Sequence, residues 1–224
     1  MPEWPDTVAD LIAAQTALAQ LDPPAWTAPE HPRVAGCFVC FPSDEPGPGG
    51  AGDMAWAAAA VPPEYATASG ITAADYRPGL LALRAGPILE QAVRSLPTPP
   101  DVLIVDATGR DHPRRAGLAV HLGAQLDLPT IGVTHRTLRA TGEWPTPERG
   151  AHSPLTLEGE IVGAWLRIQP TARPIAVHAG WRTDAQTAVE IVMSVASKVR
   201  TPEPLRQARR LARLERARAQ ALTS

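Results

Sequence analysis

Long apolar runs are absent from this chain, and so is the pattern of a secretory leader. Nothing approaches the roughly 18 uninterrupted apolar residues of a membrane-spanning helix. The first residues also lack a charged stretch followed by an apolar one, which is how a secretory signal begins. We therefore expect a cytoplasmic protein with no membrane partner.

Cysteine is scarce, because Cys37 and Cys40 are the only two in the chain. Their C-x-x-C spacing has no second cysteine pair, which excludes a four-cysteine zinc site. Both lie in an apolar run typical of a strand, where residues three apart point to opposite faces. A shared disulfide or metal would need a turn there, so we interpret the two as buried thiols.

Neither sign of charge is in large excess, since 21 Lys and Arg residues stand against 23 Asp and Glu and the formal net charge is -2. The chain as a whole has no attraction for nucleic acid, so a polyanion site must come from local arginine clusters. One cluster lies in residues 204–222, which have helical propensity. This helix either follows a phosphate backbone or packs a Leu/Ala stripe on the body or on a second copy. Its arginines are Arg206, Arg209, Arg210, Arg213, Arg216 and Arg218.

The apolar pattern that is present predicts an α/β protein, and a chain of 224 residues can bury one substantial core. Helices are expected over residues 5–21, after a tight turn within 76–94, and over 113–127, 183–198 and 204–222. Strands are expected over residues 33–41, 54–61, 66–71, 102–105, 129–133, 160–168 and 174–178. This order indicates a mixed sheet with helices on both faces.

The most informative stretch follows the four apolar residues 102–105. Here a lone carboxylate, Asp106, enters a turn that contains Gly109, His112 and Arg114. A short apolar run of this kind is typical of a parallel strand that is buried on both faces. Open α/β sheets place ligand chemistry beyond the carboxyl ends of such strands. Asp106 is therefore the first candidate for function.

Two motifs of this chain resemble the endonuclease V family. One extends from Asp106 through His112-Pro-Arg-Arg, Gly117-Leu-Ala and His121-Leu-Gly to Asp127-Leu-Pro-Thr-Ile-Gly-Val133. The other, Tyr76-Arg-Pro-Gly-Leu-Leu-Ala-Leu-Arg-Ala-Gly-Pro87, is similar to the family signature Y-x-P-G-x-L-x-x-R-E-G-P. The resemblance covers about residues 6–198, and we expect an endonuclease V-like domain at 1–200 and an Arg-rich helical tail at 201–224.

This resemblance implies a ribonuclease-H-like mixed sheet flanked by helices. It also implies Mg²⁺-dependent hydrolysis of DNA or RNA at the second phosphodiester on the 3′ side of a deaminated purine, hypoxanthine above all. Asp106 matches one of the family's metal-binding carboxylates. The other family positions have changed: the strand-one acid is Phe38, the acid of R-E-G-P is Ala85, the lysine after the I-G-V strand is His135, and the late histidine or acid is Trp181.

These replacements matter because Mg²⁺ needs several oxygen ligands in near-octahedral geometry, and one carboxylate holds it weakly. Nearby acids offer little replacement. Glu90 follows Ala85 by five residues, which turns it to another face of the predicted helix. Asp111 on the Gly109 loop has the better chance of reaching Asp106. The acids Asp44, Glu45 and Asp53 flank a hairpin turn, where we expect them in solvent.

The substrate-handling residues are better preserved. Tyr76 is similar to the family's wedge tyrosine, which fills the gap left when a base is flipped out. Pro78, Gly79 and Leu80, with Gly109, resemble the backbone of the base pocket, and Gly117 is assigned with them as substrate-binding. An unrelated sequence would suggest only a surface tyrosine in a turn.

Four polar residues remain to be assigned. His112 and Arg114, at a helix start, are predicted to contact phosphate and His112 to take part in catalysis, although a solvated basic turn is the alternative. His121 is expected to be a packed histidine that orients loop residues or Asp106. His135 can replace a lysine's charge only when it is protonated.

Three functions follow from these residues. The preferred one is a nucleic-acid-binding protein of the inosine repair family with weak or no metal-dependent cleavage. The second is an active Mg²⁺-dependent endonuclease with relocated ligands. The third is an interaction module in which the old cleft, now lined by apolar residues, serves another ligand.

Overall fold

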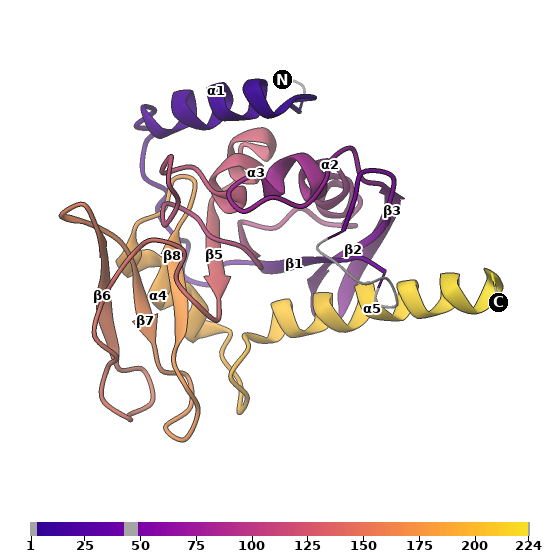
Figure 1. Ribbon diagram of the computed structural model, residues 1–224. Helices are drawn as coiled ribbons and strands as arrows, with labels where there is room; N and C mark the ends of the chain where they lie inside the picture. Colours follow the sequence, from indigo (N-terminus) through magenta and orange to yellow (C-terminus); the bar gives the residue numbers. More distant parts are fainter. Residues whose placement is uncertain (1–3, 43–48, 224) are drawn as a thin grey trace.

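The computed structural model describes residues 4–42 and 49–223, in which eight strands form one mixed sheet (Figure 1). The strand order is β3-β2-β1-β4-β5-β8-β7-β6. The central strands β1, β4 and β5 are parallel, and every other pairing is antiparallel. The strands are β1 Val34–Cys40, β2 Met54–Val61, β3 Glu64–Ile71, β4 Val102–Val105, β5 Thr130–Thr134, β6 His152–Leu157, β7 Glu160–Leu166 and β8 Ile175–Ala179.

Helices cover both faces of the sheet, as the order of elements predicted. On one face lie α2 (Leu81–Arg94) and α3 (Leu118–Leu126), with α1 (Val8–Ala19) packed over them (Figure 1). On the other face lie α4 (Ala185–Ser194) and α5 (Glu203–Thr223). None of the helices described is long and apolar enough to cross a membrane.

The strand β4 explains where the core lies. Its four residues are buried, and they alternate between the two layers: Leu103 and Val105 pack toward α2 and α3, and Val102 and Ile104 toward α4. Apolar burial on both faces fixes the register of this strand, because a slip by one residue would exchange the two layers. Asp106 follows directly, at the carboxyl edge of the parallel strands.

Most predicted elements are confirmed, with three corrections. Helix α3 begins at Leu118 instead of Pro113, because Arg115 has a left-handed backbone (φ 56°) and Gly117 is extended. Helix α1 begins at Val8 instead of residue 5, because the hydroxyl of Thr7 accepts a hydrogen bond from the backbone N–H of Asp10 and caps the helix there. The strand β6 was missed, since its sequence contains Pro154 and forms an edge strand.

The two cysteines are buried free thiols on opposite faces of β1, as predicted.

The arginine-rich helix α5 packs on the sheet. Its stripe of small and apolar residues is buried against β1 and β2, which confirms packing on the body of the protein. At Gly36 a Cβ atom would lie 2.4 Å from the backbone of Leu205, so the two segments are in close contact. The buried stripe contains Leu205, Ala208, Leu211 and Ala212. The division of the chain at residue 200 stays a prediction.

Three buried histidines make the stability of this fold sensitive to acid. Burial lowers the pKa of His112, His121 and His178 from 6.5 to about 4. The unfolded chain takes up protons below pH 6.5 while these folded side chains stay neutral until about pH 4. Their contribution to the free energy of unfolding is therefore complete above pH 6.5 and is lost as the pH falls toward 4.

We expect His121→Phe to reduce this acid sensitivity. His121 stacks on Trp4 with ring centroids 4.7 Å apart, and phenylalanine keeps the stack without a titrating group. Urea unfolding at several pH values between 6.5 and 4 should show a slope smaller by about 1 kcal/mol per pH unit, since one fully titrating group contributes at most about 1.4. Equal slopes for the variant and the wild type would show that His121 is not the group responsible.

Candidate functional site

A cavity of about 240 Å³ opens at the carboxyl edge of the parallel strands. It lies between the turn before α2 and the segment that follows β4. It brings together five of the residues singled out from the sequence, Tyr76, Pro78, Gly79, Asp106 and His112. Tyr76 stands at the rim and is 43% exposed. The volume is slightly below the range of about 300–1,000 Å³ typical of drug-sized ligands, so the cavity suits one small ring system.

The carbonyl of Gly79 organises the wall of this cavity. It accepts hydrogen bonds from Gln15 Nε2 at 3.2 Å and Arg114 Nη2 at 2.9 Å, and it lies 3.1 Å from His112 Nε2. Gly79 has a φ of 78°, a backbone conformation that is strained for any residue with a side chain. His112 is almost fully buried and Arg114 also donates to Gln15. Both residues hold the loop, and their predicted contact with phosphate stays a prediction.

Besides Arg114, three predicted substrate residues lie outside the lining of the cavity. Leu80 packs against the core beside α2. Gly109 faces the carbonyl oxygen of Ala179, which a Cβ would approach to 2.0 Å, and Gly117 faces the carbonyl of Thr108 in the same way at 2.4 Å. The two glycines let the segment after β4 fold tightly over the sheet. Their direct role in substrate binding stays a prediction.

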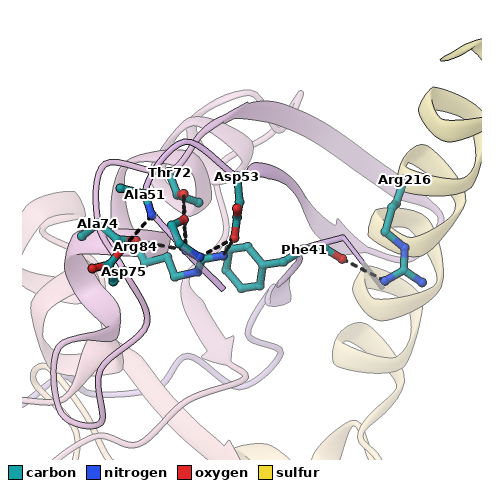
Figure 2. A network of polar contacts seen from close by, with 9 residues as sticks. Phe41, Ala51, Asp53, Thr72, Ala74, Asp75, Arg84 and Arg216 are labelled. Carbon is teal, nitrogen blue, oxygen red and sulfur yellow. Dashed lines mark hydrogen bonds and ion pairs between the residues drawn. The ribbon is translucent and has the colours of Figure 1, made fainter. Parts of the chain in front are cut away.

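A buried arginine fixes the segment that carries Tyr76 (Figure 2). Arg84 donates to the carbonyls of Gly50 and Ala74 and to the carboxylate of Asp53, and it lies over the ring of Phe41 at 4.3 Å. The hydrogen bond from Arg84 holds the pKa of Asp53 below its usual range. This pairing corrects the expectation that Asp53 lies in solvent. Asp44 and Glu45 lie outside the described residues.

Asp106 is held by an arginine from the other end of the chain. Arg209 of α5 donates from Nε to one carboxylate oxygen of Asp106 and from Nη2 to the other, both at 2.8 Å. Both side chains are less than one fifth exposed. A bidentate arginine pair uses both carboxylate oxygens and fixes their orientation. The one acid preserved from the family motif is therefore occupied by a side chain of the same protein.

Apolar side chains occupy two positions at which the family motif has an acid. The ring of Phe38 lies under the guanidinium carbons of Arg209 and Arg213, at 5.8 and 5.5 Å from its centroid. Ala85 is fully buried in the core. Among the described residues no group of three or more His, Cys, Asp or Glu is placed to hold a metal ion. Mg²⁺ requires converging oxygen ligands, so the donor set around Asp106 does not fit this ion.

The acids that were considered as substitutes are engaged elsewhere. Asp111 is fully buried, and its carboxylate accepts three backbone N–H groups at 2.7 Å, from Leu138, Arg139 and Ala140. His178 approaches the same carboxylate at 3.7 Å. Asp111 therefore anchors the loop after β5, and it is not the replacement for a lost metal ligand that its place on the Gly109 loop had left open. Glu90 pairs with Arg94 and accepts a hydrogen bond from Trp4, away from the site as predicted.

His135 does not line the cavity that holds Tyr76. Burial and the neighbouring cations Arg200 and Arg209 lower its pKa, and Asp106 raises it by a smaller amount. His135 is therefore neutral at neutral pH and does not replace the charge of a lysine.

The fold and these motifs agree with the family comparison. A family model described as Endonuclease V matches residues 24–210, from the segment before β1 into α5. The chain belongs to the endonuclease V family. Endonuclease V of Roseiflexus sp. strain RS-1 is 44% identical over 149 residues, which are 66% of this chain and 67% of that protein. Endonuclease V of Xanthomonas campestris pv. campestris strain 8004 is 37% identical over 212 residues, 93% of this chain and 89% of that protein.

Solved structures of endonuclease V share the whole architecture. The protein from Streptomyces avermitilis superposes with a TM-score of 0.85 at 35% identity, covering 98% of both chains. Endonuclease V of Ciona intestinalis, crystallised with a 24mer DNA containing an inosine followed by a ribo-adenosine, has a TM-score of 0.76 at 21% identity and covers 95% of this chain and 98% of that one. The second likeness concerns the fold alone.

The sequence of this endonuclease V family member did not reveal the role of Arg209. Its guanidinium meets a carboxylate 103 positions earlier in the chain. The arginine-rich tail was the only available signal, and nothing in it distinguishes Arg209 from its neighbours. The buried Gln15, which donates to the Gly79 carbonyl from α1, was also missed because its helix is remote from both motifs.

Proposed function

We propose that this member of the endonuclease V family binds DNA or RNA containing a deaminated purine and has weak or no metal-dependent cleavage. The observation that carries the proposal is the bidentate pair of Asp106 and Arg209 beside Phe38, together with the loss of an acid at Ala85, which is buried in the core. A guanidinium can attract a phosphate, but it has no open coordination position at which to lower the pKa of a water molecule.

The binding part of the proposal is supported by the cavity. An enzyme that reads a flipped base needs a small enclosed space, a ring at its rim to fill the vacated stack, and main-chain groups close to the base. The cavity beside Asp106 has this size, Tyr76 stands at its rim, and Pro78 and Gly79 form a rigid wall. Endonuclease V of Ciona intestinalis, which shares the fold, has been crystallised with DNA that contains an inosine.

The test is to incubate the purified protein with single- and double-stranded oligonucleotides that contain inosine or adenosine at one position. Binding and cleavage are measured with Mg²⁺, with Mn²⁺ and with a chelator, beside an Asp106→Ala control. We expect tighter binding of inosine, equal with metal and with chelator, and no cutting. Metal-dependent cutting that Asp106→Ala abolishes would establish the active nuclease instead. Equal, weak binding of all oligonucleotides would favour the third function, an interaction module for another ligand.

Tyr76→Ala is expected to lower the preference for inosine by about tenfold, because stacking of an aromatic side chain on a base is worth roughly 1–3 kcal/mol. The measurement is the ratio of Kd values for the adenosine and inosine oligonucleotides. Tyr65→Ala is the matched control, since Tyr65 is the other tyrosine of the chain, is 55% exposed and lies on β3. An unchanged ratio in Tyr76→Ala would remove Tyr76 from base recognition.

A further inference from the structure

A second and larger hollow, of about 480 Å³, is lined by His135 and the two residues that follow it. Four segments of the chain contribute to it: the loop between β5 and β6, which carries Trp144, strand β7 with Trp165, the turn before β8 with Arg173, and the segment before α5 with Arg200. We call it the Trp144 groove. It shares no lining residue with the cavity that holds Tyr76.

Within residues 4–42 and 49–223, no ion pair involves an arginine of the Trp144 groove. Arg136 and Arg173 are exposed, and in the part of the chain that the structure describes neither forms an ion pair. Arg200 donates a hydrogen bond from Nη2 to the carbonyl of Pro174 at 2.8 Å, and its buried Nε has no hydrogen-bond partner among the described residues. Burial and the nearby cations Arg173 and Arg209 lower the pKa of Arg200. Like charges gathered in this way favour binding of an anion.

Trp144 adds a flat apolar surface to this positive wall. It is 55% exposed, and its ring stands edge-on to Trp165, with centroids 6.3 Å apart and planes at 74°. Trp165 is nearly buried and is anchored by a hydrogen bond from Nε1 to the carbonyl of Gly142 at 3.1 Å. Trp144, a large exposed ring packed edge-on against the anchored Trp165, offers a surface on which another ring can stack.

One nearly buried arginine ties the two walls together. Arg167 donates from Nε to the carbonyl of Thr146 at 2.9 Å and from Nη1 to that of Ala172 at 2.6 Å. The first bond fixes the loop that carries Trp144, and the second fixes the turn that carries Arg173. The groove is therefore preorganised, so that little ordering entropy is lost when a ligand binds.

We propose that the Trp144 groove binds a single-stranded polynucleotide, with one unpaired base stacked on Trp144 and the adjoining phosphates on Arg173 and Arg200. The combination of a cationic groove and a stacking ring is how proteins hold single strands without regard to sequence. In a duplex both faces of a base are covered by its stacked neighbours, which favours a single strand over a duplex as the ligand. The proposal rests on the nucleic-acid binding proposed above, but it concerns a different surface and does not require a damaged base.

The test measures binding of a single-stranded oligodeoxythymidylate without inosine over a range of salt concentrations. Wild type is expected to bind it. Trp144→Ala is expected to weaken binding about tenfold at each salt concentration and leave the salt slope unchanged, and Trp144→Phe to restore most of the affinity. The double variant Arg173→Ala/Arg200→Ala is expected to reduce the salt slope by roughly 1.4, since each phosphate contact on a single strand contributes about 0.7.

The matched control is Arg33→Ala/Arg182→Ala, which removes the same charge. These arginines pair with Glu64 and Asp127 and lie at the opposite edge of the sheet. Thermal unfolding of every variant confirms that it is folded.

Equal salt slopes in the two double variants, or wild-type affinity in Trp144→Ala, would overturn the proposal. So would failure of the wild type to bind oligodeoxythymidylate while it binds the inosine oligonucleotide, and that result would leave the proposed function standing. Binding of both oligonucleotides with equal affinity, lost in Trp144→Ala, would support the groove and reject recognition of inosine.

Discussion

Asp111→Ala is expected to destabilise the protein by about 3–5 kcal/mol, which for a domain of this size is a large part of the whole free energy of unfolding. The fully buried carboxylate accepts three backbone N–H groups at 2.7 Å, and alanine leaves all three without a partner. Each buried donor that loses its partner costs roughly 1–3 kcal/mol, reduced here where the loop relaxes toward solvent.

Two further variants define the origin of this loss. Asp184→Ala removes an N-cap carboxylate that accepts one exposed N–H, from Thr187, and is expected to cost about 1 kcal/mol. Asp111→Asn keeps the shape but has only one acceptor oxygen, so its cost should lie between those of the two alanine variants. The measurement is urea unfolding at neutral pH. Equal losses in Asp111→Ala and Asp184→Ala would contradict the role of Asp111 as the anchor of the loop after β5.

Phe38→Asp combined with Arg209→Ala is expected to create a divalent-cation response that the wild type lacks. The backbone N–H of Asp106 donates to the carbonyl of Cys37, so residue 38 is the neighbour of Asp106 across adjacent parallel strands. An aspartate at 38 would place two carboxylates side by side, and removal of Arg209 would free the oxygens of Asp106. Paired carboxylates with water are a usual way to hold Mg²⁺.

The readout is the midpoint of thermal unfolding with and without Mg²⁺. The variant is expected to gain about 2–3 kcal/mol when the Mg²⁺ concentration is about 100 times the Kd, and the wild type to gain nothing. Phe38→Ala/Arg209→Ala is the control, because it opens the same space without adding a carboxylate. Stabilisation of the wild type by Mg²⁺, lost in Asp106→Ala, would show that the native site holds the ion after all.

Only part of this site could be predicted from the sequence. The buried strand β4 and the acid at its end could be predicted from the sequence. A run of four apolar residues that ends in Asp106 and a glycine-containing turn is typical of a parallel strand buried on both faces. The turn with Tyr76, Pro78 and Gly79 was equally visible, since proline and glycine fix the backbone locally. The start of α3 was predicted too early, because Arg115 has a left-handed backbone and its side chain contacts Leu157 and Glu158, which lie about 40 residues later in the chain.

The sequence alone determined the α/β class, the family resemblance and the loss of acids at Phe38 and Ala85, because these follow from local pattern and residue identity. Tertiary structure alone decided the partner of Asp106, the anchoring role of Asp111 and the meeting of Trp144 with Arg173 and Arg200. Each of these contacts joins segments widely separated in the chain. Side-chain pairing between such segments depends on how the layers of the fold pack together. Hydrophobic periodicity predicts single helices and strands and does not predict these contacts.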